Sequence, residues 1–447
     1  MNMESHAWLG EYPSRWNMVK LRQVLTPVSM KNHPDMPLLS VVREKGVIKR
    51  NVEDKKENHN YVPDDLSNYK LVKCGQFAMN KMKAWQGSYG ISKYDGIVSP
   101  AYFVFDVNYD LNPDFFNCAI RCMTYVSYFG RASDGIRVGQ WDLSIGRMKE
   151  IPFLVPPREE QDQIVRFLDW KVSGINRLIN IKRKEIKDLE SMKQATVSSA
   201  VTRGLNPNAP MKFSGVKWLG NIPVHWELLR NKNIFQETKE IVGDKADLYP
   251  LLSLTTKGII LRDTASGKGK FPKDFNTYKI VRQGDIAFCL FDIDETPRTV
   301  GLSDYDGMLT GAYTIFHVKN VNSRYVYYYY LALDNVKALR SLYSGLRKTI
   351  NTGTFLGTKL PVPPREEQDQ IVRFLDSRMS DFNRLISLRK QQIEELEDLK
   401  TRLISDVVTG KIDIRDVKIP SFDMVEEDID EEISEDIVEA NQKTEAE

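Results

Sequence analysis

The stretch Pro-Pro-Arg-Glu-Glu-Gln-Asp-Gln-Ile-Val-Arg-Phe-Leu-Asp occurs twice in this chain, at Pro156–Asp169 and again at Pro363–Asp376, 207 positions later. Fourteen identical residues in order do not recur by chance, so the chain contains an internal duplication. The match continues at the same offset through Asn176–Ile179 and Asn383–Ile386. A period of about 200 residues is too long for a solenoid and indicates two copies of one domain-plus-helix unit.

Each repeated stretch opens a long segment without proline, Glu159–Thr202 in the first copy and Glu366–Thr409 in the second. The double proline and the acidic pair at the start favour a helix N-terminus. About 44 residues give a helix of about 65 Å. The apolar spacing alternates between four and three with one basic gap, at Lys182 and at Arg389, which predicts a coiled-coil seam. The seam residues are Leu168, Val172, Ile175, Ile179, Ile186 and Leu189, and Leu375, Met379, Phe382, Ile386, Ile393 and Leu396.

A second repeated element predicts how the helices pair. Trp218-Leu219-Gly220 follows the first helix and matches Trp8-Leu9-Gly10 at the N-terminus, so Trp8 is expected near the end of the second helix. A lone helix with an exposed apolar stripe is unstable, so the two helices are expected to pack on each other. The sequence therefore predicts an α+β fold. Two mixed α/β domains are separated by two long antiparallel helices in a coiled coil, pseudo-two-fold and pseudo-cyclic, with the N-terminus close to Lys411–Asp416.

The expected segments are a first domain at 1–155, a first helix at 156–204, a linker at 205–226, a second domain at 227–362, a second helix at 363–416 and a disordered acidic tail at 417–447. Residues Ser421–Glu447 hold twelve acidic residues and one lysine, a net charge of −11, which leaves +13 on the other 420 residues. A basic body of this kind favours a polyanionic partner such as DNA.

Catalytic and metal-binding signatures are missing from the sequence. There is no GxxxxGK[ST] phosphate loop, no GxGxxG and no Asn-Pro-Pro-aromatic box, and the five histidines and four cysteines lack metal-ligand spacing. The chain is therefore expected not to be an enzyme and to hold no metal. Free cysteines and the absence of an apolar leader predict a cytoplasmic protein, and the longest apolar-looking run, Tyr325–Leu333, is too short to cross a membrane.

Basic, amide and aromatic residues gather in a loop of each variable domain, where they suit contacts to phosphates and base edges. A solvated loop with a half-buried Trp85 is the alternative for the first domain. Arg137 and Arg347 follow a glycine at matching places, and the alternative for them is pairing with the acidic start of the next helix. The candidate DNA-binding residues are Asn80, Lys81, Lys83, Trp85, Gln86, Tyr89 and Arg137 in the first domain, and Lys268, Lys270, Thr296, Arg298, Arg347 and Lys348 in the second.

The polar residues of the repeated stretch are identical in both copies although the surrounding domains differ. Helix initiation and seam packing explain the apolar positions but explain the polar identities poorly. A surface used twice, by two copies of one partner, is the sharper hypothesis. Its residues are Arg158, Glu160, Gln161, Gln163 and Arg166, with Arg365, Glu367, Gln368, Gln370 and Arg373 in the second copy.

These features together resemble the specificity subunit of a Type I restriction-modification system. The resemblance rests on a P-P-x-x-E-Q-x-x-I-x-x-F-L-D helix after each variable domain and WLG-x2-P-x2-W before it, and it covers the chain to about residue 416. The acidic tail departs from the family pattern. The resemblance implies two target-recognition domains, each reading one half of a split DNA site. It also implies helices that set the spacer and dock two methyltransferase subunits.

The resemblance places the cofactors in the partners. S-adenosylmethionine would belong to the methyltransferase subunits, and ATP and Mg to the restriction and translocation subunits, with none in this chain. Two other classes remain open at this point. One is a coiled-coil adaptor that binds only protein, and the other is a bifunctional enzyme with a hidden site.

Overall fold

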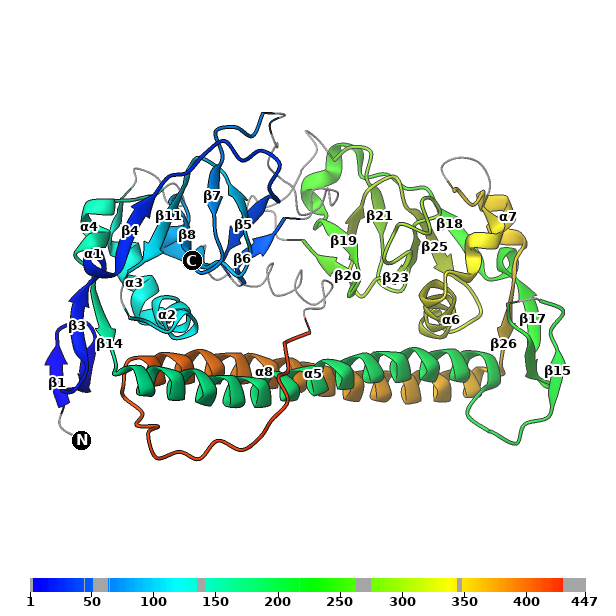
Figure 1. Ribbon diagram of the computed structural model, residues 1–447. Coiled ribbons are helices and arrows are strands. Elements are labelled where there is room, and N and C mark those ends of the chain that lie inside the picture. The colour runs from blue at the N-terminus through cyan, green and yellow to red at the C-terminus, as the bar shows by residue number, and fades with distance from the viewer. Residues whose placement is uncertain are drawn as a thin grey trace. The chain divides into compact units, whose positions relative to one another are not determined.

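The computed structural model describes residues 3–43, 45–50, 63, 65–108, 110–134, 141–216, 218–262, 275–343 and 348–428. The chain divides into two compact units, and Figure 1 labels their elements. Unit 1 comprises Met1–Arg183 with Lys390–Glu447, and unit 2 comprises Lys184–Arg389. Each unit contains one β-rich domain and part of both long helices, so the predicted α+β class is confirmed.

The domain of unit 1 is built on an antiparallel four-stranded sheet, with the order β4 (Leu25–Val28), β11 (Tyr102–Val107), β8 (Phe77–Asn80), β9 (Tyr89–Ile91). Five two-stranded pairs surround it: β1 (Met3–His6) with β2 (Gly10–Pro13), β3 (Asn17–Lys20) with β14 (Pro152–Val155), β5 (Leu39–Val42) with β6 (Gly46–Lys49), β7 (Lys70–Val72) with β10 (Gly96–Val98), and β12 (Ser133–Asp134) with β13 (Asp142–Leu143). The helices are α1 (Leu21–Val24), α2 (Pro113–Ile120), α3 (Met123–Arg131) and α4 (Ile145–Lys149).

Unit 2 repeats this strand order although its sequence differs. Its sheet has the order β18 (Phe235–Thr238), β25 (Thr314–Val318), β22 (Ile286–Phe288), β23 (Val300–Leu302). The pairs are β15 (Met211–Phe213) with β16 (Asn221–Pro223), β17 (Glu227–Arg230) with β26 (Lys359–Val362), β19 (Leu252–Thr255) with β20 (Gly258–Leu261), and β21 (Lys279–Val281) with β24 (Gly307–Leu309). The helices are α6 (Ser323–Asn335) and α7 (Thr352–Gly357). Sequence analysis could not derive this shared topology, because strand pairing is decided by long-range contacts.

The two long helices are α5 (Arg158–Arg203) and α8 (Arg365–Val408), within one residue of the predicted bounds. They run antiparallel in each unit. In unit 2, Lys193 bonds Asn383 and Glu185 pairs with Arg389, so the basic gap of α8 is neutralised by α5. In unit 1, Arg183 pairs with Glu397 and Asn176 bonds Lys400. The seam is buried as predicted at Leu168, Ile175, Ile179, Ile186, Leu375, Met379 and Ile393.

The repeated Trp-Leu-Gly elements lie against the helix ends, as the sequence predicts. In unit 1, Leu9 and Trp16 share one core with Val407 and Val408 of α8. Gly410 has φ +77°, and an added Cβ there would come within 2.4 Å of Pro13, so the close approach requires glycine. In unit 2, Leu219 and Trp226 pack in the same way with Val197 and Val201. The two-fold relation and the segment boundaries stay predictions.

The expectation of a disordered tail from residue 417 is wrong for its first part. The chain leaves α8, bows away from the two helices and returns to α5, where backbone groups of Val425, Glu426 and Asp428 are hydrogen-bonded (Figure 1). Residues 429–447 lie outside the described part of the chain. Of the described helices, none combines the length and the apolar character that a membrane span needs.

Candidate DNA interface and helix junctions

The glutamine of each repeated stretch joins the helix to the domain of its own unit. The Gln161 side chain is 1% exposed. It accepts a hydrogen bond from the backbone N–H of Asn112 at 2.8 Å and donates one to the Pro156 carbonyl at 2.9 Å. Asn112 is the N-cap of α2, and its side-chain amide donates to Asp162. The α2 start is therefore tied to the α5 start.

Unit 2 has the same junction with the same geometry. Gln368 accepts from the Asn322 N–H and donates to the Pro363 carbonyl, both at 2.8 Å. Asn322 caps α6, and its amide donates to Asp369 at 2.7 Å. Identical polar residues are thus needed twice because each copy builds the same domain–helix joint.

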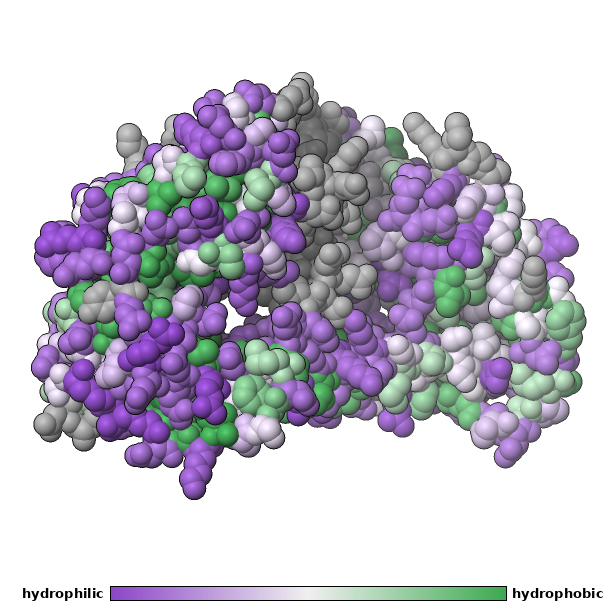
Figure 2. All heavy atoms as spheres, viewed as in Figure 1, coloured by the Kyte–Doolittle hydropathy of each residue, from purple (hydrophilic) through white to green (hydrophobic). Residues whose placement is uncertain are grey.

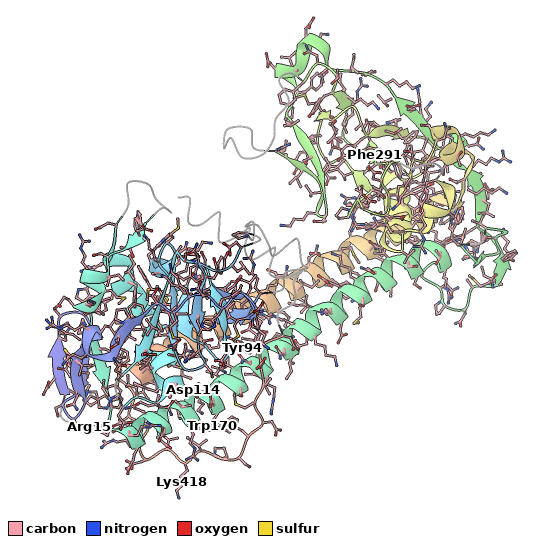
Figure 3. The ribbon with its side chains drawn as sticks, turned by 45° about the horizontal axis from the view of Figure 1, so that its top comes forward. Arg15, Tyr94, Asp114, Trp170, Phe291 and Lys418 are labelled. Atoms are coloured by element: carbon pink, nitrogen blue, oxygen red, sulfur yellow. The ribbon has the colours of Figure 1, made fainter. Side chains whose placement is uncertain are left out.

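The glutamate before this glutamine holds the segment that follows each Trp-Leu-Gly element. Glu160 receives two bonds from the Arg15 guanidinium, at 3.0 and 2.5 Å, and Arg15 lies at the start of α5 in Figure 3. Glu367 accepts from the Trp226 indole N–H at 3.1 Å and bonds His225 at 2.8 Å. A bidentate arginine pair is the stronger of the two because of its matched geometry.

These contacts correct the partner-surface hypothesis for part of its residues. Glu160, Gln161, Glu367 and Gln368 serve contacts within their own unit, and Gln163 bonds the chain after α8. Contacts inside the chain therefore account for the repeated glutamate, Glu160 and Glu367, and for the repeated glutamine that follows it, Gln161 and Gln368. The remaining residues of the hypothesis lie at the surface: Arg158, which pairs with Asp110 and Asp162, Arg365, which pairs with Asp369, and the exposed Arg166, Arg373 and Gln370.

The β8–β9 loop of unit 1 forms a compact turn. Asn80 ends β8 and its side chain accepts from the Met82 N–H, while Gly87 has φ +90° and closes the turn on Ala84. Lys83 is exposed, and Lys81 pairs with Asp142 at 2.9 Å. Gln86 is half-buried, and the half-buried Trp85 packs against Trp141 with ring centroids 5.1 Å apart.

Tyr89 was expected to contact DNA, and the structure contradicts this. It is fully buried, packs between Phe77 and Phe129, and burial raises the pKa of its hydroxyl well above the usual value. Loop composition alone could not show that β9 turns this ring inward.

A cluster of cations at the start of β7 was missed by the sequence analysis. The Lys70 ammonium donates to the Tyr102 carbonyl at 2.6 Å. Burial lowers the pKa of Lys70, and the nearby positive charges of Lys31 and Lys81 lower it further. The Tyr102 hydroxyl accepts from Asn80 at 3.4 Å, so the cluster adjoins the β8–β9 loop. Positive charges near one another favour an anion such as a phosphate, although Asp142 already pairs with Lys81. The sequence signal was the Tyr69–Lys73 element, which recurs at Tyr278–Arg282.

The same lysine position recurs in unit 2. Lys279 donates to the Tyr313 carbonyl, also at 2.6 Å. Burial lowers its pKa, Glu237 opposes that shift and Lys239 adds to it. The Tyr313 ring stacks on Phe291, labelled in Figure 3, with centroids 6.5 Å apart.

The expected role of Arg298 needs correction. Its guanidinium donates to Asp334 at 3.1 Å and to Asn335 at 3.0 Å, and the Asp334 side chain is 1% exposed. Arg298 therefore neutralises a buried carboxylate of α6. The Thr296 carbonyl accepts from Lys337, while Lys348 pairs with Asp294 and Glu295. The remaining candidates, Arg137, Lys268, Lys270 and Arg347, lie outside the described residues.

The visible surface over the sheet of unit 1 is mainly hydrophilic (Figure 2). Within the described residues, His, Cys, Asp and Glu form no group that suits a metal ion.

Comparison with known proteins identifies the class of molecule to which this arrangement is similar. A family model for the Type I restriction modification DNA specificity domain matches residues 224–398. The Type I restriction enzyme MjaVIII specificity subunit of Methanocaldococcus jannaschii is 26% identical over 312 residues, covering 65% of this chain and 68% of the relative. The putative MjaX specificity subunit of the same organism is 22% identical over 430 residues, covering 91% and 96%.

A solved structure described as "Structural basis underlying complex assembly and conformational transition of the type I R-M system" is also similar. It superposes with a TM-score of 0.64 at 14% identity, covering 90% of this chain and 99% of the other. At this identity the likeness concerns the fold.

Proposed function

Because this chain is a specificity subunit of a Type I restriction-modification system, we propose that its two domains each read one half of a bipartite DNA site. In the same proposal, α5 and α8 set the unread spacer and dock two methyltransferase subunits. The specificity subunit is the non-catalytic, DNA-binding member of the Type I complex. A hidden enzymatic site or an adaptor that never touches DNA is therefore not needed to explain the chain.

The observation that carries the half-site proposal is one scaffold presenting two different sets of side chains. Both units have the same strand order and the same half-buried lysine beside the sheet, Lys70 and Lys279. The loops that follow the matching strands β8 and β22 differ in sequence. The loop after β8 carries Lys81 and Lys83, whereas the loop after β22 carries Phe291. Shared cations suit phosphate contacts, whereas different loop residues suit different bases.

The spacer proposal is supported by the unbroken length of the two helices. α5 has 46 residues and α8 has 44, and both run through unit 1 and unit 2. A continuous helix fixes distance through its rise of about 1.5 Å per residue.

Docking of the methyltransferase subunits would use the polar side chains that stay exposed near the N-termini of α5 and α8. Arg166 and Arg373 stand at matching places in the two copies and stay exposed. S-adenosylmethionine would enter the complex with these subunits, and ATP and Mg with the restriction subunits.

Methylome sequencing of a host with and without this gene tests the DNA-reading proposal. The expected result is an interrupted, asymmetric adenine motif that disappears on deletion. A continuous motif, or one unaffected by the deletion, would contradict it.

Insertion of one helical turn tests whether α5 and α8 set the length of the unread spacer. Four residues added to each helix, after Arg183 and after Arg389, lengthen the rods by about 6 Å, or one to two base pairs. We expect a longer spacer with both half-sites unchanged. An unchanged spacer with a correctly folded complex would refute the role of the helices.

A further inference from the structure

The segment Val417–Asp428, named here the acidic strap, contacts unit 1 at both of its ends, and its second contact is with α5. Its entry is fixed by Gln163, whose side-chain amide donates to the carbonyls of Ile414 at 3.3 Å and Val417 at 2.9 Å. Val417 and Ile419 then pack against the core of unit 1. Figure 3 labels Lys418 on the strap and Trp170 on the adjacent part of α5.

Beyond this entry, α5 holds the strap through its backbone. The Asn176 amide donates to the Val425 carbonyl at 2.9 Å, and Ser173 accepts from the Val425 N–H at 3.2 Å. Asn180 does both, donating to the Glu426 carbonyl and accepting from the Asp428 N–H, each at 3.0 Å. Side chains spaced three and four residues apart on one helix face thus bind an extended peptide.

The residues that hold the strap are named here the unit 1 groove: Gln163, Ser173, Asn176, Asn180, Arg183 and Lys400. Glu427 is the strap side chain that this groove binds through charge. It pairs with Arg183 at 2.6 Å and with Lys400, which α8 supplies. Asn176 and Ser173 are 8% and 4% exposed beneath the strap. The groove of unit 1 is therefore a site for an extended acidic segment, and the chain fills it with its own tail.

The duplication repeats part of this set, although Ser387 stands at the position that matches Asn180 and Lys390 at the one that matches Arg183. Residues 207 positions away are Gln370 for Gln163, Ser380 for Ser173, Asn383 for Asn176, and Lys193 for Lys400. The internal bond is also repeated, since Lys193 donates to Asn383 at 2.7 Å as Lys400 does to Asn176.

No described segment covers this second set. Gln370, Ser380 and Asn383 are all exposed. Among the described residues the Lys193 ammonium bonds Asn383 and forms no salt bridge, and burial lowers its pKa although the charge of Glu190 opposes that shift.

The surface of unit 2 is hollow beside these residues. A hollow of about 860 Å³ is lined by Met192, Thr196, Arg203, Leu205 and Phe374, where Phe374 is the counterpart of the core residue Phe167. A second hollow of about 440 Å³ is lined by Leu205, Gln370 and the carboxylates of Glu366 and Glu367, so the acidic part of a ligand would not lie there. Together with Ser380, Asn383 and Lys193 these residues form the unit 2 groove.

We propose that the unit 2 groove binds an extended acidic segment of a partner protein, in the way that the unit 1 groove binds the strap. Charge selects the occupant, because Lys193 and Arg203 stand at the groove and the segment seen in the matching place carries Glu-Glu-Asp. Apolar residues before the acidic ones would enter the hollow beside Phe374, as Val417 and Ile419 pack in unit 1. The inference does not depend on how DNA is read.

A labelled peptide with the sequence of the whole strap, Val417–Asp428, titrated against the purified chain by fluorescence anisotropy, tests this. The full chain is expected to bind one peptide, because its own strap fills the other groove at high effective concentration. A chain ending at Asp416 is expected to bind two. Lys193→Glu should weaken binding to the full chain at least tenfold. The matched control Lys400→Glu, 207 positions away and made in the chain ending at Asp416, should leave the unit 2 site intact, because no strap is then present to compete for it.

Three results would overturn the proposal. The first is that the full chain binds no peptide, and the second is that Lys193→Glu weakens binding no more than Lys400→Glu does. The third is that the chain alone forms dimers in sedimentation and that Lys193→Glu abolishes these dimers. The last result would assign the groove to the strap of a second copy. Circular dichroism of each variant confirms that lost binding does not reflect unfolding.

Discussion

Truncation of Gln368 to alanine tests whether the repeated stretch holds the domain to the helix. Gln368 is 3% exposed and makes two bonds of 2.8 Å, one from the Asn322 N–H and one to the Pro363 carbonyl. Alanine removes both bonds and leaves the two backbone groups without partners. If the residue instead served a partner protein, its loss would leave the free chain unchanged.

The expected cost follows from these two groups. A buried polar group that loses its hydrogen bond costs about 1–3 kcal/mol, so two such groups together cost about 2–6 kcal/mol. For a unit of this size each kcal/mol lowers the unfolding temperature by about 2–4 °C. Gln368→Ala should therefore lower the melting temperature of unit 2 by roughly 4–24 °C.

Gln370→Ala is the matched control, since this glutamine lies two residues away and is exposed. Thermal unfolding followed by circular dichroism measures both variants, and hydrogen exchange at Asn322 locates the change. The control should stay within about 0.5 kcal/mol of the parent chain. Equal stability of the two variants, with lost methyltransferase binding in Gln368→Ala, would refute the joint and restore the partner hypothesis.

Three further outcomes are expected. Arg298→Ala should destabilise unit 2 by about 2 kcal/mol in thermal unfolding, because the buried Asp334 then keeps only Lys337 and Thr299 as partners. An unchanged melting temperature with lost DNA affinity would instead show that Arg298 contacts DNA. Lys83→Ala should reduce the slope of log K against log salt for DNA by about 0.9, and an identical slope would exclude a phosphate contact. Burial favours a raised pKa for Glu427, but bonds from Lys400 and Arg183 outweigh it and hold that pKa below its usual range. The strap is therefore stabilised at neutral pH and released as the pH falls below about 4. Hydrogen exchange at Val425 and Asp428 should show this, and unchanged protection at pH 3 relative to α5 would contradict it.

The duplicated stretch and the heptad spacing were enough to predict two long helices, their approximate bounds and their antiparallel pairing. These features are local or periodic. An apolar residue every third or fourth position must be buried whatever the rest of the chain does. The contact of the Trp-Leu-Gly elements with the helix ends also followed from the order of the segments.

The domains were less predictable, because strand order depends on contacts between residues far apart in the chain. Tyr89 and Arg298 show the difficulty. Each lies in a loop or strand whose composition suits DNA, yet one is a core ring and the other pairs with Asp334 from a distant helix. The Lys70 cluster was missed for the same reason, since Lys31 and Lys81 come from separate segments.

By itself, the sequence determined that one unit was built twice around paired helices, since identity and periodicity are written along the chain. Only the tertiary structure decided what the repeated polar residues do. Burial and partners showed that Gln161 and Gln368 close a joint within their own unit, while Gln163 binds the tail and Gln370 stays open. Gln163 and Gln370 have the same sequence context but different hydrogen-bond partners, because only the chain after α8 continues into a strap. A hydrogen bond depends on which groups are close in space, and the local sequence does not determine that.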